Sequence, residues 1–359
     1  MKVILVFDVP HWTGIGIYAL NLYELLSQHI EDLKLVYVGG LKDDYETYTN
    51  LDYLERSRTR ILSPILIRRN YRRLIDDKSF EEYIFHYLGS DFYALRWRKG
   101  VITFHDLIKD IMVPSNAWKP LNILTSLERN RKLKQNKRLA KKAVKIVTIS
   151  ERTRSNLYKE LGLDSIMIHH WIDWKYFTIR DKAETRNRMG FSENFKYLLS
   201  VGDDKPIKRI DLIDKFADYL PGNYKLIKVG APLKSKNAIN VGTLNNKFQY
   251  ASLFNISEAY VHLSDDEGFG LPIIEALGSN TPIVCRNTEI NRELLENAAI
   301  IIEPSEMEKA VTQVIRMLED SATLENLKYN MHLKRSAYDS SIALKEYISL
   351  YKEIYKNFP

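Results

Sequence analysis

Residues 264–275 read SDDEGFGLPIIE and combine two glutamates with a glycine-bearing loop. Glu267 and Glu275 lie eight positions apart, and Pro272 stands where a helix would begin. Backbone N–H groups around residues 269–271 would then point at an anion such as a diphosphate, because helix N-termini favour negative charge. The two carboxylates would accept hydrogen bonds from hydroxyl groups. We therefore expect a site for an extended, anionic ligand here, rather than a plain helix-capping loop.

Two weaker motifs also follow apolar segments. Residues 13–18 (TGIGIY) let a ligand approach the backbone, but Ala19 stands where a GxGxxG motif has its last glycine. In TFHDL, residues 103–107, His105 stands beside Asp106 at the end of an apolar segment. Taken alone, the first motif fits a plain strand-to-helix turn as well as a ligand loop, and the second fits a structural histidine.

Metal and disulfide chemistry have little support in the sequence. The adjacent carboxylates Asp203-Asp204 and Asp265-Asp266 could ligate a metal ion, but such pairs on surface loops are usually solvated. Cys285 is the one cysteine, which excludes a disulfide framework, and no Cys/His spacing offers a structural zinc site. We expect neither a metal site nor a disulfide.

Short apolar segments precede these motifs and alternate with helical patterns. Such alternation predicts βαβ units on a parallel sheet, and two series of them predict an α/β protein with two doubly wound domains. In doubly wound sheets ligands bind beyond the carboxyl ends of the strands, which is where the motifs fall. The predicted strands are residues 3–7, 33–38, 100–104 and 145–149 in the first half, and 197–201, 225–229, 259–263, 282–285 and 299–302 in the second.

The boundary between the two series is expected near residues 172–178, ahead of the charged stretch 180–188. The last helix, residues 341–357, carries an apolar face that must pack on another element. That face consists of Ile342, Leu344, Tyr347, Ile348, Tyr351, Ile354 and Tyr355.

The positive charge is unevenly distributed along the 359 residues. The formal net charge is +7, yet residues 1–180 hold 30 basic and 21 acidic residues, whereas the remainder hold 23 and 25. A basic half beside a near-neutral half suggests that one domain faces an anionic partner: nucleic acid, a membrane surface or a phosphorylated substrate. No apolar run approaches the ~20 residues of a membrane span. The first residues, MKVILVFDVP, resemble a strand more than a signal peptide, which predicts a soluble protein of a reducing compartment.

In this order, the motifs resemble those of the family 4 retaining glycosyltransferases, sugar-nucleotide-dependent enzymes of the GT-B fold. The most specific is Glu-x7-Glu, present as EGFGLPIIE at residues 267–275. TGIGIY is similar to the family's glycine loop and TFHDLI to its strand-end histidine motif. TISERTRSNL at residues 148–157 and HHWID at residues 169–173 follow in the family's order. The resemblance covers nearly the whole chain.

This resemblance implies two Rossmann-like domains facing each other across a cleft, with the C-terminal helix packing back on the N-terminal domain. Residues 1–173 would bind the acceptor, residues 174–340 would bind the nucleotide-sugar, and residues 341–359 would form the returning helix. It also implies a hexosyltransferase that retains anomeric configuration and needs no metal. The sequence offers no sure carboxylate nucleophile, which favours same-face attack assisted by the leaving phosphate over double displacement.

Residue by residue, the resemblance implies catalytic roles for three side chains. His105 would contact the transferred sugar, Glu267 would bind its hydroxyls, and Lys208 would neutralise the diphosphate. Glu275 would hold the ribose. The full donor-binding set implied is Gly16, Gly202, Lys208, Arg209, Gly268, Phe269, Gly270, Leu271 and Glu275.

Two positions depart from the family pattern. Asp203 stands where the family has the arginine of a two-cation clamp, so Lys205 or Arg209 would have to substitute. His170-Trp171 replaces the usual Asn-Gly of the hinge motif.

Three basic clusters mark the first half: residues 68–73, residues 96–99, and residues 129–145 with nine basic and no acidic residues. Aromatic side chains stand among or near them, as at membrane interfaces. We expect Arg68, Arg69, Arg72, Arg73, Arg96 and Trp97 to face the acceptor or a membrane, with Tyr71 and Trp118 as further aromatic residues. A solvated Lys/Arg-rich helix face explains these clusters equally well.

The predicted co-substrate is a UDP- or GDP-sugar, and no other cofactor is expected. The acceptor would be a glycan or lipid-linked molecule, reached from the cytoplasm by peripheral contact with the anionic inner face of the cytoplasmic membrane. A nucleotide-sugar epimerase or isomerase on the same scaffold is the main alternative. A nucleic-acid-binding protein is less consistent, because nothing resembles a helix-turn-helix, RRM or zinc finger.

Overall fold

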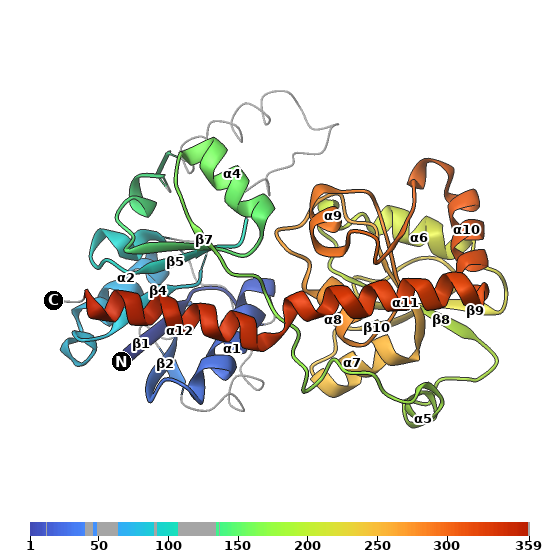
Figure 1. The fold of residues 1–359 in the computed structure, drawn as a ribbon, viewed down its shortest axis with the longest axis horizontal. Helices are drawn as coiled ribbons and strands as arrows, with labels where there is room; N and C mark the ends of the chain where they lie inside the picture. Colours follow the sequence, from blue (N-terminus) through green and yellow to red (C-terminus); the bar gives the residue numbers. More distant parts are fainter. Residues whose placement is uncertain are drawn as a thin grey trace. The chain divides into compact units, whose positions relative to one another are not determined.

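The computed structural model describes residues 1–11, 13–39, 46–48, 64–89, 92–106, 134–135 and 137–357. The chain divides into two compact units (Figure 1). Unit 1 comprises Met1–His170 together with Ser340–Pro359, and unit 2 comprises Trp171–Asp339.

Unit 1 is built on a seven-stranded sheet, counted over the described residues, with the strand order β3-β2-β1-β4-β5-β6-β7. Every pair of neighbours is parallel except β2 and β3. The strands are β1 (Lys2–Phe7), β2 (Asp32–Tyr37), β3 (Glu46–Tyr48), β4 (Ile84–Tyr87), β5 (Val101–Phe104), β6 (Lys145–Thr148) and β7 (Ile166–Met167).

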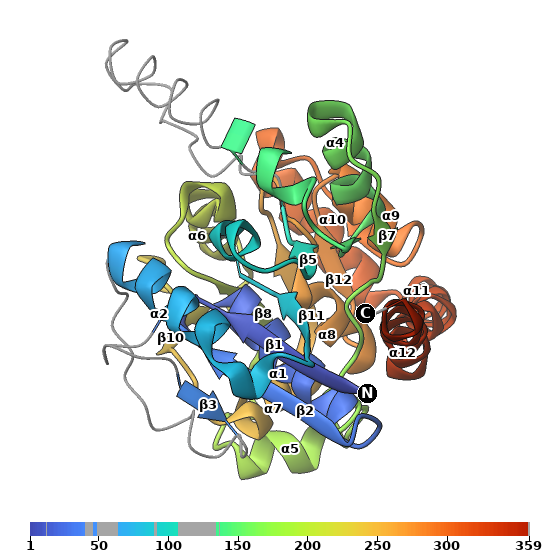
Figure 2. The same cartoon turned by 90° about the vertical axis from the view of Figure 1, so that its left-hand side faces the viewer.

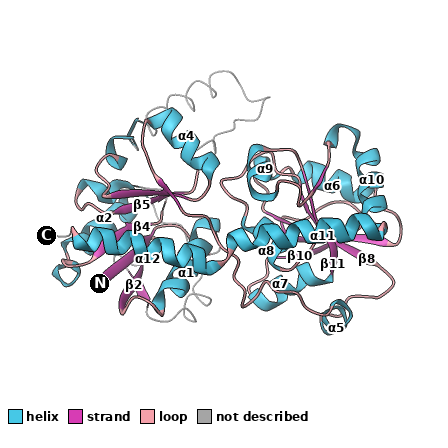
Figure 3. Ribbon diagram, viewed as in Figure 1, coloured by secondary structure: helices cyan, strands magenta, loops and turns pink. Residues whose placement is uncertain are grey.

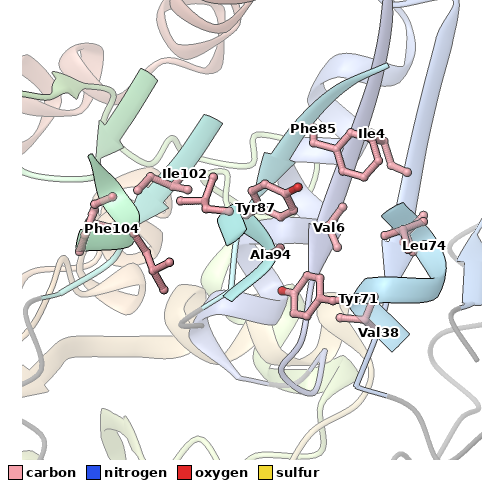
Figure 4. Close-up of a cluster of buried hydrophobic side chains, with 14 of the residues drawn as sticks. Ile4, Val6, Val38, Tyr71, Leu74, Phe85, Tyr87, Ala94, Ile102 and Phe104 are labelled. Carbon is pink, nitrogen blue, oxygen red and sulfur yellow. The ribbon is translucent and has the colours of Figure 1, made fainter. Parts of the chain in front are cut away.

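Helices cover both faces of this sheet (Figure 2). They are α1 (Gly14–Ser27), α2 (Pro64–Asp76), α4 (Glu151–Leu161) and α12 (Ser340–Lys356), with the short 3-10 helices η2 (Lys78–Phe80) and η3 (Phe92–Arg96). Alternate residues of β1, Ile4 and Val6, point into the core beneath α2, η3 and α4 (Figure 4). The opposite face is covered by α1 and α12.

Unit 2 is a fully parallel, six-stranded sheet in the order β10-β9-β8-β11-β12-β13. Its strands are β8 (Lys196–Gly202), β9 (Tyr224–Gly230), β10 (Ala238–Gly242), β11 (Ser257–His262), β12 (Ile283–Cys285) and β13 (Ile300–Ile301). Its helices, drawn in cyan in Figure 3, are α5 (Lys182–Arg188), α6 (Ile210–Asp218), α7 (Lys247–Ile256), α8 (Leu271–Gly278), α9 (Glu289–Leu295), α10 (Met307–Glu319) and α11 (Ser321–Arg335), with η4 (Pro206–Lys208), η5 (Pro304–Glu306) and η6 (Ser336–Tyr338). The prediction of an α/β protein with two doubly wound sheets is therefore confirmed.

The C-terminal helix α12 belongs to unit 1, as expected. The Tyr347 hydroxyl lies within hydrogen-bonding distance of the Tyr18 hydroxyl of α1, and the Lys145 ammonium pairs with Glu353 at 2.7 Å. The predicted apolar face was partly wrong. Ala343 and Leu350 are buried, whereas Ile342 and Tyr355 are exposed, because the stripe of period 3.6 that faces the sheet is centred on Tyr347 and Tyr351.

Some predicted features lie outside the described residues. These are Leu107 and Ile108 of the TFHDLI motif, Trp118 and, within the third basic cluster, residues 129–133 and 136. Within the residues that the structure describes, no helix is both long and apolar enough to cross a membrane.

Candidate active site

Two loops of unit 2 meet at the carboxyl ends of neighbouring strands. One follows β8, which ends at Gly202, and turns through η4; the other follows β11 and leads into α8. The backbone N–H of Asp265 donates to the carbonyl of Ile207 at 2.9 Å, which ties the second loop to η4. The predicted donor-binding positions of unit 2 are therefore gathered at one edge of the sheet, where ligands of doubly wound folds bind.

Lys208 and Glu267 form the central ion pair of this edge. The Lys208 ammonium donates to Glu267 Oε1 at 2.6 Å, and the Glu267 side chain is only 13% exposed. Burial alone would raise the pKa of Glu267, but the adjacent Lys208 ammonium outweighs it, and the pKa lies below its usual value. Glu267 is therefore an ionised carboxylate that can accept hydrogen bonds from ligand hydroxyls.

Arg209 is committed to carboxylates of its own loops. Its guanidinium binds Asp211 through two nitrogens, at 2.9 and 2.8 Å, and Asp265 at 3.0 Å. Its backbone has φ of 47°, in the left-handed region where a non-glycine residue is uncommon. Arg286 also contacts Asp265. Arg209 thus orders the loop, and its engagement with two carboxylates makes it a poor substitute for the family's second diphosphate-binding cation.

Asp203 and Lys205 occupy the outer part of the first loop. Both side chains are exposed, and they pair at 3.3 Å. The positive charge of Lys205 is therefore offset by the neighbouring Asp203 carboxylate, which makes Lys205 a weak ligand for a diphosphate.

Lys228 is a cation that the sequence analysis missed. Its residue is fully buried near the carboxyl end of β9, and its ammonium donates to the carbonyls of Gly202 and Val229 at 2.7 Å each. Burial lowers the pKa of Lys228 to about 8; Asp203 acts in the opposite direction. The rule that sites follow strand ends could have found Lys228, since it stands inside a predicted strand that points at this edge.

The first turn of α8 carries the glycine motif. Gly270 precedes the helix with φ of 92°, and no side chain caps this end. Its backbone N–H groups can therefore serve a bound anion. Phe269 is buried and packs edge-on against Tyr338 with ring centroids 6.0 Å apart, which fixes the turn beside Gly268 and Leu271.

Glu275 lies on α8, about one helical turn after Leu271. The Tyr250 hydroxyl donates to Glu275 Oε2 at 2.6 Å. Burial raises the pKa of Glu275 to about 7, partly offset by this hydrogen bond. One carboxyl oxygen is thus held by Tyr250, and the group changes charge near neutral pH.

His262 is a second residue that sequence analysis missed. It ends β11, and its Nε2 lies 3.8 Å from Glu267 Oε1 while its Nδ1 lies 3.1 Å from the Tyr260 hydroxyl. Burial lowers the pKa of His262 to about 4, so the ring is neutral at pH 7. It packs beside the Lys208–Glu267 pair without adding charge.

In unit 1, His105 lies just beyond the carboxyl end of β5. Its Nε2 lies 3.0 Å from the carbonyl oxygen of Leu88, which can only accept, so Nε2 carries the proton. Burial lowers the pKa of His105 to about 4. The neutral ring therefore presents Nδ1 as a hydrogen-bond acceptor. The rings of Tyr18 and His170 lie 4.8 and 6.2 Å from it, measured between centroids.

A buried polar network lies next to His105. His86 Nε2 lies 2.8 Å from the Thr103 hydroxyl, and His86 Nδ1 lies 2.6 Å from the hydroxyl of Tyr351 in α12. Burial lowers the pKa of His86 to about 3, so this ring is neutral as well. The C-terminal helix therefore supports the strands from which His105 projects.

Gly16 is required by packing inside its own loop. A Cβ at this position would lie 2.2 Å from the carbonyl oxygen of Pro10 and 2.5 Å from the Cα of His11. The Thr13 side chain also caps α1 by accepting from the Gly16 N–H at 3.1 Å. These contacts explain the glycine as part of a tight strand-to-helix turn, whether or not a ligand approaches it.

The six residues expected to face the acceptor or a membrane come together in unit 1. They line one pocket of about 650 Å³ with Asp76, between α2 and η3. Among the described residues, no group of three or more His, Cys, Asp or Glu side chains is placed to hold a metal ion.

Comparison with solved structures defines the class of fold. Sucrose-phosphate synthase from Thermosynechococcus elongatus matches with a TM-score of 0.77 at 15% identity, covering 99% of this chain and 100% of that one. Anabaena Alr3699/HepE, solved with UDP-glucose, matches with a TM-score of 0.72 at 15% identity over 98% and 100% of the two chains. Two doubly wound units with such neighbours define a GT-B fold.

Sequence comparison points to the same class of protein. The model for glycosyl transferases group 1 matches residues 181–334. O-antigen chain mannosyltransferase B from Escherichia coli is 26% identical over 87% of this chain and 89% of its own length. Together these matches support a family 4-like glycosyltransferase, as the Glu-x7-Glu segment predicted.

Proposed function

We propose that this glycosyltransferase moves a hexose from a nucleotide-diphosphate sugar to a saccharide, glycolipid or lipid-linked acceptor, with retention of anomeric configuration and without a metal ion. The observation that carries the proposal is the 2.6 Å pair of Lys208 with Glu267, beside an uncapped helix N-terminus preceded by Gly270. This places a cation, backbone N–H groups and an ionised carboxylate at one strand-end edge. A sugar diphosphate presents the complementary phosphates and hydroxyls.

Mannose is the hexose we propose, carried as a UDP- or GDP-sugar. The relative aligned over most of the chain is named an O-antigen chain mannosyltransferase. The nucleotide stays open between the two, because the structural neighbour solved with UDP-glucose is only 15% identical.

The proposed chemistry depends on charge that develops on the leaving diphosphate. As the glycosidic bond breaks, negative charge grows on the phosphate oxygens, and a positioned cation and helix N–H groups lower that barrier. Lys208 has three N–H donors, so its ammonium can keep Glu267 and bind a phosphate oxygen together. Lys228, which donates to the Gly202 carbonyl, adds a fixed positive charge at pH values below about 8.

The sugar would be oriented by side chains that accept hydrogen bonds rather than by side chains that donate protons. Glu267 is ionised and His105 is neutral with its proton on Nε2, so both would accept hydrogen bonds from sugar hydroxyls. Glu267 has no proton to deliver to the leaving group, and the Nε2 proton of His105 is directed at the Leu88 carbonyl. We therefore assign acceptor activation to the leaving phosphate itself, on the same face of the sugar, which gives retention.

The acceptor is assigned to unit 1 because this unit carries the excess of basic residues. We propose that the enzyme works in the cytoplasm and touches the inner face of the cytoplasmic membrane, where a lipid-linked acceptor would be found. Sedimentation with anionic liposomes tests this contact. Salt-reversible pelleting would support docking, and no pelleting at low salt would contradict it.

Donor use is tested by release of nucleoside diphosphate from a panel of UDP- and GDP-sugars, with and without saccharide acceptors. We expect release from a mannosyl donor, and we expect Glu267→Gln and Lys208→Met to lower turnover by about tenfold or more. NMR of the product must show the anomeric configuration of the donor. Near-normal turnover by both variants would overturn the assigned site, and an inverted product would overturn retention.

The same panel separates the alternative of an epimerase or isomerase. Such an enzyme would convert one nucleotide-sugar into another without releasing nucleoside diphosphate. Chromatography of the recovered nucleotide-sugars distinguishes the two outcomes.

A further inference from the structure

His262 is a buried histidine beside the carboxylate proposed to bind sugar hydroxyls, and the donor chemistry described above gives it no role. It is the last residue of β11 and is 4% exposed. Its Nε2 lies 3.8 Å from Glu267 Oε1, is closed off from solvent and has no hydrogen-bond partner among the described residues. Buried polar nitrogens are nearly always paired, so this exception calls for an explanation.

The neighbours of the His262 ring decide which nitrogen carries its proton. Nδ1 lies 3.1 Å from the hydroxyl of Tyr260, a group that can donate or accept. The Glu267 carboxylate beside Nε2 is ionised and can only accept. A lone pair on Nε2 would therefore be repelled by the carboxylate, whereas an N–H is attracted to it. The single proton of the neutral ring thus belongs on Nε2, with the Tyr260 hydroxyl donating to Nδ1.

Tyr260 is itself held in place by packing. Its side chain is fully buried, and its ring lies 5.6 Å from that of Phe254 in α7, measured between centroids. Tyr260 and His262 stand two residues apart in β11, so their side chains lie on the same face of the sheet. The hydroxyl and the imidazole are therefore positioned by one buried strand rather than by a loop.

One oxygen of Glu267 lies near two nitrogens from different elements. Lys208 of η4 donates to Oε1 at 2.6 Å, whereas His262 Nε2 of β11, at 3.8 Å, is beyond hydrogen-bonding range. A phosphate oxygen bound by Lys208 would share the charge of its ammonium and weaken its attraction for Glu267. A movement of about 1 Å would then bring Oε1 within hydrogen-bonding range of Nε2.

We propose that His262 is a positioning residue for the donor sugar, because its Nε2–H becomes a second hydrogen-bond donor to Glu267 when Lys208 binds the diphosphate. Glu267 would then stay ionised and oriented as an acceptor for sugar hydroxyls. Tyr260 supports this role by donating to Nδ1, which keeps the proton on Nε2. The assignment rests on the proposed function, since it requires a donor that engages both Lys208 and Glu267.

The position of the ring proton is the first test, and it needs no donor. Nitrogen-15 NMR distinguishes a protonated from an unprotonated ring nitrogen. The signals of His262, one of eight histidines, are those that vanish in His262→Gln. We expect a protonated Nε2 and an unprotonated Nδ1 at pH 7. A proton on Nδ1 would overturn the proposal.

Two amide substitutions then separate the two ring nitrogens. The amide nitrogen of glutamine lies as many bonds from Cβ as Nε2 does, and that of asparagine as many as Nδ1 does. We expect His262→Asn to lower kcat/KM for the sugar donor about tenfold and His262→Gln to stay within about threefold of the wild type. Circular dichroism checks the folding of both variants. Equal losses in the two variants would overturn the proposal.

Binding of the nucleotide without the sugar provides an internal control. The affinity for UDP and GDP should stay within about twofold in His262→Asn, because Glu267 is assigned to the sugar and not to the nucleotide. A loss of nucleoside diphosphate affinity as large as the loss in kcat/KM would mean that the substitution disturbs the whole site, and it would overturn the positioning role.

A cycle of double substitutions tests whether His262 acts through Glu267. In the background of Glu267→Gln, His262→Asn should lower kcat/KM by less than about twofold, because the carboxylate that it positions is gone. A further tenfold loss in that background would show that the effect does not pass through Glu267, and it would overturn the proposal.

The matched pair for the supporting hydroxyl is Tyr260→Phe and Tyr224→Phe. Tyr224 is also a buried tyrosine of unit 2, at the start of β9, and its hydroxyl donates to Glu319 at 3.1 Å. We expect kcat/KM to fall about threefold in Tyr260→Phe and to be unchanged in Tyr224→Phe. Equal losses would contradict the role of Tyr260.

The Glu267→Gln variant separates this inference from the proposed function. Normal turnover in Glu267→Gln would defeat the proposed site and with it the role of His262. A loss of turnover in Glu267→Gln without any loss in His262→Asn would defeat the role of His262 alone.

Discussion

The strand-end loops of unit 2 and the arginine pocket of unit 1 use cations in opposite ways. In the loops, Lys208 lies against Glu267, and Arg209 lies against Asp211 and Asp265. The described residues that line the pocket are five arginines, one aspartate and one tryptophan. Opposite charges in contact hold a site in shape without a ligand, whereas a cluster of like charges attracts ions of the opposite sign.

The same contrast explains the uneven net charge of the chain. Unit 2 places its cations among carboxylates, so the proposed diphosphate site lies in a nearly neutral part of the sequence. Unit 1 concentrates basic residues, and its field should attract anions over a longer range, with a strong dependence on salt. The following experiments test how far the charges of unit 2 are balanced.

The largest effect is expected from breaking the balanced pair in unit 2. Lys208→Met leaves Glu267 as a largely buried carboxylate without its cation, which should cost about 3 kcal/mol of unfolding free energy as well as turnover. The doubly substituted Lys208→Met/Glu267→Gln should recover most of the stability, because no uncompensated charge remains, but none of the turnover. Urea unfolding and nucleoside diphosphate release measure the two quantities.

The matched control for the Lys208 variants is Lys205→Met, which removes an exposed cation from the same loop. Its pairing with Asp203 is solvated and should contribute less than about 1 kcal/mol. If Lys205→Met costs as much as Lys208→Met, the loop is not organised around the Lys208–Glu267 pair.

The strand and motif pattern was largely predictable from sequence. Each of the nine predicted strands has a counterpart within a few residues, because parallel strands buried on both faces are short apolar runs. The central strand β4 was missed, since its four residues include His86. That histidine is tolerated there only because Thr103 and Tyr351, distant in sequence, lie within hydrogen-bonding distance of its ring nitrogens.

The motif glutamates were predictable, but the side chains that set their charge states were not. Glu267 and Glu275 are recognisable by spacing. Their partners, Lys208 and Tyr250, come from other segments, and only the folded sheet brings them within 2.6 Å. Lys228 could be picked out as a lysine inside a predicted strand, but the carbonyls that it binds are visible only in the structure.

Glu275 is a buried carboxyl group of unit 2 that is held by a tyrosine hydroxyl. Its pKa of about 7 lies above the 4.5 of an ordinary glutamate, so the folded protein binds this proton more tightly than the unfolded one. Unfolding free energy should therefore fall as pH rises from about 4.5 to about 7, by up to about 3 kcal/mol. Glu275→Gln should abolish this loss: the variant should match the wild type near pH 4.5 and be more stable at pH 8.

Urea unfolding at these two pH values measures the difference. The control is Glu258→Gln, which removes a carboxylate that is paired with a cation, Lys182, at 2.6 Å. This variant should not stabilise the protein at pH 8. A Glu275→Gln variant that is less stable than the wild type at pH 8 would show that the ionised carboxylate supports the fold.

A variant of Lys228 tests whether this buried cation takes over the role of the arginine that the family has in place of Asp203. Lys228→Met removes a positive charge and two hydrogen bonds to the loop carbonyls, so the affinity for nucleoside diphosphate should fall about tenfold, or 1.4 kcal/mol. Because the pKa is about 8, wild-type affinity should also weaken as pH rises through 8, and this dependence should vanish in the variant. Calorimetric titration measures both, with exposed Lys215→Met as the control; equal losses in the two variants would contradict the assignment.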